Sequence, residues 1–202
     1  VIFTSDNGSN GRNGGSNRPL SGAKGSTMEG GMRVPMIVRW PGRIPANSTC
    51  RELGTMMDLL PTFCTLTGAL LPSQKIDGFD ISGMLFGKED AYSQYEALYY
   101  YRRRQLQAIR YGDWKYHLPL NATHPNWTTA KQAGPGRSGK LVNLKSDLQE
   151  KIDVSAANPE VIKRMEAHWK NAVLALGNDE TLGGEQRDAR TLDSSKPMTL
   201  EK

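Results

Sequence analysis

The amino-acid sequence predicts an α/β fold, and three observations support it. Within residues 1–87, short apolar strands that end in turn residues alternate with a helical pattern. Residues 97–118 then have the rhythm of antiparallel hairpins, with strand-like runs on either side of a Tyr-Gly-Asp turn. A long amphipathic helix is predicted at 158–176. We therefore expect an α/β core, followed over residues 88–177 by a small antiparallel sheet packed with a C-terminal helix.

The chain opens with an apolar strand that runs directly into the turn Ser5-Asp6-Asn7-Gly8. In open α/β sheets, ligands bind just beyond the carboxyl ends of strands, so Asp6 and Asn7 stand where a site is expected. A carboxylate beside an amide oxygen offers two hard oxygen ligands of the kind that Ca²⁺ or Mg²⁺ prefers. The alternative is an ordinary Asp-Asn-Gly turn that holds no ligand, because such turns are common.

A loop rich in Gly, Ser and Asn follows over residues 9–31. Its composition favours disorder for residues 9–18. In the second half, Lys24 lies between small residues that let the backbone and one amine approach a ligand closely. An ammonium group suits the oxygens of sulfate or phosphate. The alternative for Lys24 is a solvated loop lysine without a function.

The next segments predict a strand and a helix of the core. Residues 34–39 form an apolar run, and we interpret Glu29 and Arg33 before it as a structural charge pair or loop clamp. The helix is expected within 52–68, with Asp58 as its N-cap. Its core-facing residues by spacing are Leu59, Phe63, Leu66 and Leu70.

The C-terminal half contains a basic triplet, Arg102–Arg104, next to tyrosines. Alternation along a strand sends these arginines to opposite faces, so no single stacking platform results and nucleic-acid binding is not expected. Residues 119–139 resemble a polar loop, and the helix at 158–176 begins with an Asn-Pro-Glu cap sequence. The polar residues 178–202 predict a disordered tail.

The composition fits one domain with a small annex: 202 residues, 37% of them hydrophobic, with a net charge of +5. The mild basic excess fits an anionic substrate or partner. No apolar run approaches the roughly 20 residues of a membrane-spanning helix. Of the two cysteines, we expect Cys64 to be a small buried hydrophobe rather than half of a disulfide with Cys50.

Several motifs, in this order and spacing, resemble the C-terminal portion of type I sulfatases of the arylsulfatase class, in the alkaline phosphatase superfamily. The resemblance runs from residue 1 to about 177. The motifs are the strand ending in Thr4-Ser5-Asp6-Asn7-Gly8, the run GAKGSTMEGGMRVP at 22–35, Met57-Asp58-Leu59-Leu60-Pro61-Thr62, Asp77-Gly78-Phe79-Asp80, Gly112-Asp113-Trp114-Lys115-Tyr116 and Leu141-Val142-Asn143-Leu144.

The resemblance implies the C-terminal part of the sulfatase α/β sandwich core and a site around a calcium ion. Asp6 and Asn7 match the late Asp-Asn pair of calcium ligands, and Lys24 matches the lysine that contacts the sulfate. His117 matches a histidine that lines the substrate pocket in some arylsulfatases, and His124 is a weaker candidate. The implied substrate is a sulfated carbohydrate or an aryl sulfate, and the implied location is outside the cytoplasm, in the periplasm, the extracellular space or the lysosome.

One departure from the family pattern concerns the nucleophile. These sulfatases carry Cys-x-Pro-Ser-Arg or Ser-x-Pro-x-Arg, whose first residue becomes formylglycine, and neither motif occurs in these 202 residues. We therefore expect part of a sulfatase, inactive on its own. Two alternatives remain open: a phosphodiesterase or phosphonate hydrolase of the same superfamily, and a non-catalytic polyanion-binding remnant.

Overall fold

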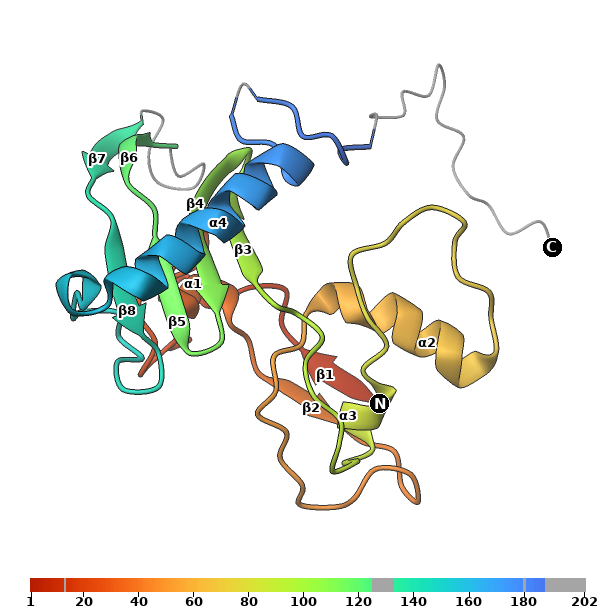
Figure 1. Ribbon diagram of the computed structural model, residues 1–202. Helices are drawn as coiled ribbons and strands as arrows, with labels where there is room; N and C mark the ends of the chain where they lie inside the picture. The colour runs from red at the N-terminus through yellow and green to blue at the C-terminus, as the bar shows by residue number, and fades with distance from the viewer. Residues whose placement is uncertain (13, 125–132, 180, 188–202) are drawn as a thin grey trace.

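The computed structural model of the chain describes residues 1–12, 14–124, 133–179 and 181–187. Its strands form three antiparallel groups: the pair β1-β2, the four-stranded sheet β3-β4-β5-β8 and the pair β6-β7 (Figure 1). This mixture of sheets and a few helices confirms the predicted α/β class. No helix of the described residues is long and apolar enough to cross a membrane.

The two strands predicted near the N-terminus form a ribbon of their own. β1 (Ile2–Thr4) pairs with β2 (Met36–Val38), and Ile2 lies opposite Val38. An apolar strand of this kind is usually buried, but Phe3 is 66% exposed and Ile37 is 63% exposed. The reason is that the ribbon has only two strands, so within this chain its apolar side chains have little to pack against.

The helix predicted within 52–68 is present and is preceded by a capped 3₁₀ turn. A short 3₁₀ turn, η1 (Met56–Asp58), leads into α2 (Leu59–Thr67), which ends at Gly68 with φ of 73°. Asp58 occupies the N-cap position of α2, as predicted, but its side chain makes no cap hydrogen bond there. Its carboxylate instead accepts a hydrogen bond from Thr55 N at 2.6 Å, which completes a capping box around η1 with Thr55 as the N-cap. Asp58 also accepts one from Phe79 N at 2.8 Å, so it ties the following loop and the short helix α3 (Ser82–Leu85) to α2.

The apolar positions of α2 are only partly buried. Cys64 is buried, as expected, and both cysteines are free thiols, so the described chain contains no disulfide. Phe63 and Leu70 were predicted to face the core, but they are 46% and 94% exposed. The buried residues of α2 are instead Pro61, Thr62 and Cys64, so the predicted core-facing stripe is wrong: within the described chain too few partners cover it.

The C-terminal sheet and its helix form the main hydrophobic core. The sheet consists of β3 (Leu98–Arg102), β4 (Gln105–Tyr111), β5 (Trp114–His117) and β8 (Lys140–Asn143). Helix α4 (Pro159–Leu176) lies along one face (Figure 1). The fully buried residues of this layer are Leu106, Ile109, Leu118, Leu141, Met165 and Ala172. The predicted hairpins and the helix that covers them are thereby confirmed.

Two features differ from the predicted polar connections. β6 (Leu120–Thr123) and β7 (Gly134–Arg137) pair within the segment expected to be a loop; part of that segment, 125–132, lies outside the described residues. Glycines and a proline in β7 concealed the strand in the sequence. Before α4, a 3₁₀ turn, η2 (Ser155–Ala157), precedes Asn158, which occupies the N-cap position without a side-chain cap.

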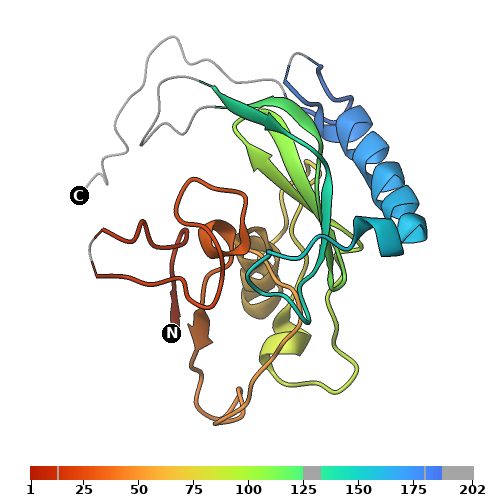
Figure 2. The ribbon, with the colours of Figure 1, turned by 90° about the vertical axis from the view of Figure 1, so that its left-hand side faces the viewer.

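The disorder predicted from residue 178 is wrong for the described residues 178, 179 and 181–187, whose backbone contacts the sheet and α4. Asn178 Oδ1 accepts a hydrogen bond from Leu106 N at 2.8 Å, and Gly184 N donates to Leu174 O at 2.8 Å. Residues 188–202 of the predicted tail lie outside the described residues. Seen from the side, the sheet lies between α4 and the N-terminal loops, so its second face is available to support those loops (Figure 2).

Candidate functional site

The turn at residues 5–9 and the loop at residues 21–31 pack against each other through their backbones. Gly8 N donates to Gly31 O at 3.1 Å, and Lys24 N donates to Ser9 O at 3.1 Å. The short helix α1 (Glu29–Met32) closes the loop. The structure thus brings Lys24 to the segment that carries Asp6 and Asn7.

Glycines permit this close approach. A Cβ atom on Gly8 would lie 1.8 Å from Gly30 O, and one on Gly30 would lie 2.6 Å from Ser21 O. No side chain fits at these distances. The missing Cβ of Gly8 lets the two loops meet, and that of Gly30 lets the 21–31 loop pack on itself. These two glycines therefore serve the contact between the two loops and the tight packing within the second.

Asn17 joins the two loops from the side. Ser9 N donates to Asn17 Oδ1 at 2.7 Å, and Asn17 Nδ2 donates to Ser9 O at 2.8 Å and Gly22 O at 3.1 Å. The disorder that we expected for residues 9–18 is therefore wrong for residues 9–12 and 14–18, which the structure describes. Composition missed the contact because its partners are main-chain atoms that leave no pattern in the sequence.

Asp6 is exposed and Asn7 is half-buried at the end of β1. Among the described residues, neither side chain takes part in a hydrogen bond or an ion pair, so both leave an oxygen free to bind a cation. A carboxylate and an amide oxygen fit calcium by type. The same part of the chain contains no group of three or more His, Cys, Asp or Glu side chains able to hold a metal. The residues present therefore fit half of a calcium site.

Lys24 is exposed at the tip of the loop, between Ala23 and Gly25. Its backbone is fixed by Ser9, whereas no carboxylate in the described part of the chain pairs with its ammonium group. A lysine on a fixed backbone with an unpaired charge is able to bind an anion. This geometry is compatible with the sulfate-contact role predicted for Lys24 and does not test it.

A buried cluster of charged side chains lies between the 21–31 loop and the C-terminal sheet. Lys115 Nζ lies 2.9 Å from Glu29 Oε1 and 2.8 Å from Glu150 Oε1, and all three side chains are at most 1% exposed. The predicted charge pair between Glu29 and Arg33 is wrong: Arg33 is exposed, and its backbone N–H binds Glu29 O. Glu29 is a loop clamp, as the alternative interpretation held, but its partner is Lys115.

His117 is buried at 2% exposure on the same face of β5 as Lys115. Its Nε2 lies 3.0 Å from Glu150 Oε1. Burial lowers the pKa of His117 more than the hydrogen bond with Glu150 raises it, so the imidazole is neutral at pH 7. His117 does not line an open pocket within the described residues, and its contact with substrate stays a prediction. His124, the weaker candidate, pairs with Asp179 at 2.7 Å.

Sequence reasoning identified neither Lys115 nor Glu150 as part of the site. Lys115 was noted only as part of a Trp-Lys motif, and Glu150 lies in a polar connection after β8. Alternation along β5 could have placed Lys115 and His117 on one face. The contact with Glu150 spans 35 positions of sequence, and no local pattern indicates it.

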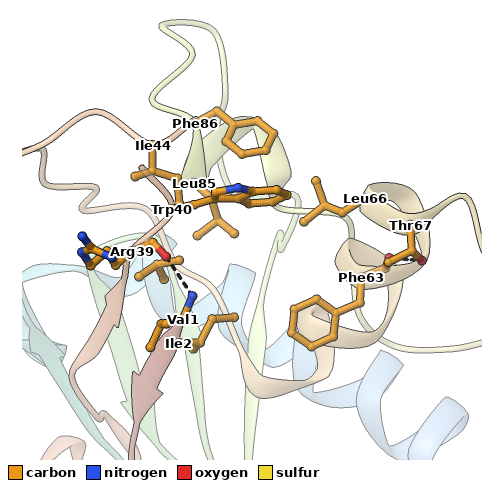
Figure 3. Close-up of a pocket in the computed structure, with 11 residues that line it drawn as sticks. Val1, Ile2, Arg39, Trp40, Ile44, Phe63, Leu66, Thr67, Leu85 and Phe86 are labelled. Atoms are coloured by element: carbon orange, nitrogen blue, oxygen red, sulfur yellow. Dashed lines mark hydrogen bonds between the residues drawn. The ribbon is translucent and has the colours of Figure 1, made fainter. Parts of the chain in front are cut away.

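An apolar pocket of about 250 Å³ lies between the β1-β2 ribbon, α2 and α3 (Figure 3). Trp40, Phe63 and Phe86 line it, and Val1 N donates to Arg39 O at its edge. None of its lining residues belongs to the 21–31 loop or to the Asp6-Asn7 turn. Its lining is apolar apart from Arg39 and Thr67, and the Thr67 hydroxyl donates to Phe63 O at 2.8 Å within α2, so we regard the pocket as a packing surface.

Comparison with known proteins bears on the nature of this site. The family model described as Sulfatase matches residues 1–69. The chain is 35% identical over 184 residues to human arylsulfatase A, which covers 82% of this chain. It is 43% identical over 123 residues to the dog N-acetylgalactosamine-6-sulfatase, which covers 58% of this chain. The chain belongs to the sulfatase family.

The fold of the chain agrees with a solved structure along most of its length. The structure of Ps i-CgsB in complex with k-i-k-neocarrahexaose matches 85% of this sulfatase chain with a TM-score of 0.68 and 29% identity. The chain covers 35% of that protein, 36% of human arylsulfatase A and 23% of the dog enzyme. This sulfatase chain therefore spans about a quarter to a third of the length of its relatives.

The family model and the buried cluster overlap only in part. Residues 1–69 of the sulfatase chain include Asp6, Asn7, Lys24 and Glu29. Lys115 and Glu150, which hold Glu29 from below, lie outside the matched range. The candidate site thus depends on side chains from both parts of the chain.

Proposed function

We propose that this chain is part of an enzyme that hydrolyses sulfate esters, and that it supplies one half of the catalytic site. The observation that carries the proposal is the backbone contact between the Lys24 loop and the Asp6-Asn7 turn. In a member of the sulfatase family, it brings the segment with an unpaired ammonium group to the segment with two oxygen atoms that are free to ligate a metal.

In this proposal, Asp6 and Asn7 are two of the oxygen ligands of a calcium ion, and Lys24 contacts the sulfate. Calcium, when bound, acts as a Lewis acid on the sulfuryl oxygens. The ammonium group of Lys24 adds a second positive charge beside the sulfuryl oxygens while negative charge builds up on the leaving-group oxygen. A formylglycine nucleophile would come from a residue that is not among these 202.

The substrate class that we propose is a sulfated carbohydrate or an aryl sulfate. Support comes from the names of relatives: one is an N-acetylgalactosamine-6-sulfatase, one an arylsulfatase, and a solved neighbour holds a neocarrahexaose. His117 remains a candidate for substrate binding in this proposal. Export to the periplasm, the extracellular space or the lysosome is also part of it.

The domain division in this proposal places residues 1–87 in the catalytic α/β domain and 88–177 in a C-terminal subdomain. The exposed apolar surface of the β1-β2 ribbon and α2 then packs against the rest of the catalytic domain. Phe3 at 66% and Ile37 at 63% exposure are the side chains with most to gain from such burial.

Two alternatives give different products or none. A phosphodiesterase or phosphonate hydrolase would use the same lysine on phosphoryl oxygens, and a non-catalytic remnant would only bind polyanions. The free oxygen donors at Asp6 and Asn7 favour a metal-assisted hydrolase over simple polyanion binding, because carboxylates repel an anion unless a cation lies between them.

The test is an assay of the full-length protein that carries this chain, on matched nitrophenyl esters of sulfate and phosphate. We expect turnover of the sulfate ester that depends on added calcium and on a formylglycine motif elsewhere in the protein. Preferential turnover of a phosphodiester would favour the first alternative. Binding of sulfated polysaccharide without turnover of either ester would favour the second.

A further inference from the structure

The buried charges beneath the 21–31 loop bind the loop through its main chain. Lys115 Nζ donates to Thr27 O at 2.8 Å, and Glu150 Oε2 accepts from Glu29 N at 2.8 Å. Contacts to backbone atoms set the position of the loop itself, rather than the rotamer of one side chain. Both contacts lie within five residues of Lys24 along the chain.

The cluster is balanced in charge, which favours a single arrangement. The carboxylates of Glu29 and Glu150 face the ammonium of Lys115, and the Arg110 guanidinium lies 3.5 Å from Glu29 Oε2. A buried ion that loses its partner is strongly unfavourable, so alternative positions of the loop would leave charges unpaired. His117 donates to Glu150 without adding a charge.

An irregularity in the sheet directs a further side chain at the loop. The register between β3 and β4 shifts between Tyr100 and Tyr101, so Gln107 is an extra residue of β4. Thr27 Oγ1 donates to Gln107 Oε1 at 3.0 Å, and Tyr100 OH donates to Glu29 Oε1 at 2.8 Å. Bulges of this kind often re-aim side chains next to active sites.

The anchored residues lead directly to both halves of the candidate site. Gly30 N donates to Ser21 O at 2.7 Å, and Gly31 O accepts from Gly8 N at 3.1 Å, next to Asn7. A shift of Glu29 would therefore move Gly30 and Gly31 and loosen their contacts with Gly8. The cluster, the loop and the Asp6-Asn7 turn form one continuous set of close contacts.

We infer that Lys115 and Glu150 are positioning residues, which hold the 21–31 loop on the C-terminal sheet so that Lys24 stays beside the Asp6-Asn7 turn. The inference rests on the proposed function for the role of Lys24, whereas the anchoring of the loop is independent of it. The C-terminal sheet is then part of the framework of the site and not an appendage to the catalytic domain.

Amide hydrogen exchange in the full-length protein tests the anchoring. Glu150→Gln keeps the size of the side chain but removes its charge, and Glu185→Gln, at an exposed ion pair with Lys75, is the matched control. We expect exchange at residues 29–31 to rise by about tenfold in Glu150→Gln, with α4 unchanged and no change in the control. Unchanged protection of the loop, or an equal rise throughout the chain, would overturn the inference.

A milder variant addresses the case in which Glu150→Gln does not fold. Thr27→Val removes only the hydroxyl contact with Gln107 and keeps the shape of the side chain. A smaller rise in exchange at the same amides supports the anchoring. No local rise in a folded Thr27→Val protein contradicts it.

A kinetic cycle tests whether the cluster acts through Lys24. In an active full-length enzyme, Glu150→Gln is expected to lower kcat/KM by about 10- to 100-fold. Added to Lys24→Ala, it should cause little further loss, because the positioned group is already absent. If the double variant instead loses kcat/KM by the product of the two single losses, the cluster does not act through Lys24. If Lys24→Ala alone leaves turnover unchanged, the proposed function fails, while the exchange experiment still decides the anchoring.

Discussion

The ammonium nitrogen of Lys115 lies 2.9 Å from Glu29 Oε1, and the two residues are 86 positions apart in the sequence. Both side chains are almost completely buried. This pair joins the loop of the candidate site to the central strand region of the C-terminal sheet. It explains why a small sheet with an ordinary hydrophobic core has a charged second face.

Removing Lys115 is expected to destabilise the fold strongly. Lys115→Met leaves Glu29 and Glu150 buried without their shared partner, which costs about 3–5 kcal/mol of the free energy of unfolding. Urea denaturation measures the loss. Lys75→Met is the control, because the Lys75–Glu185 pair is largely exposed and contributes about 1 kcal/mol or less. Equal effects of both substitutions would contradict the role of the buried cluster.

Stability is expected to fall in acid through two groups of this cluster. Burial lowers the pKa of His117 below its usual 6.5. Burial alone would raise the pKa of Glu150, but hydrogen bonds from His117 and the charge of Lys115 outweigh it and lower the pKa from 4.5 to about 2. In both cases the unfolded chain binds protons more readily than the folded one.

The contribution of these two groups to the free energy of unfolding should therefore be constant above about pH 7 and decline as the pH falls. The His117 contribution declines below pH 6.5, and that of Glu150 between about 4.5 and 2. Thermal melts over this range measure it. His117→Gln should flatten the upper part of the decline; an unaltered profile in that variant would rule out its contribution.

The tight packing within the 21–31 loop predicts an intolerance to side chains at one glycine. Gly30→Ala places a Cβ atom 2.6 Å from Ser21 O and 2.7 Å from Gly22 O, both backbone atoms. We expect a loss of about 1–3 kcal/mol in thermal or urea unfolding. Gly54→Ala is the control, since its nearest neighbour lies at 3.6 Å, and it should have little effect. A fully stable Gly30→Ala protein would contradict the packing described.

Local patterns in the sequence predicted the elements whose packing depends on neighbours along the chain. The helix at 158–176 was predicted almost to the residue, because Pro159 and Gly177 mark its ends and its apolar spacing is regular. The hairpins of the C-terminal sheet were predicted for the same reason, whereas the strand that ends at Thr4 was predicted from its apolar run before a turn. Alternation or periodicity is enough where one face is buried.

Contacts between distant segments were not predictable in this way. Lys115 was not assigned to the site, because a lysine in a strand is usually solvent-facing and its acidic partners lie 86 and 35 positions away. The role of Asn17 was missed because it binds backbone atoms. Asp6, Asn7 and Lys24 were assigned from a resemblance, and the structure adds the backbone contacts that bring them together.

The calcium role of the turn predicts a specific loss of metal. Asp6→Asn in the full-length protein removes one carboxylate charge and should lower the calcium affinity by about tenfold or more. Asp90→Asn, at an exposed aspartate away from the turn, is the matched control. Isothermal titration with calcium measures both variants. Wild-type affinity in Asp6→Asn would exclude this carboxylate as a ligand.

The most direct test of the proposed site is the turnover of a sulfate ester by the full-length Lys24→Ala variant. The loss of a charge that stabilises the developing anion should lower kcat by about 100-fold or more, in a protein that stays folded. Lys145→Ala, at an exposed lysine of a surface turn, should retain wild-type kcat. Wild-type kcat in Lys24→Ala would contradict the assignment of this loop to the sulfate.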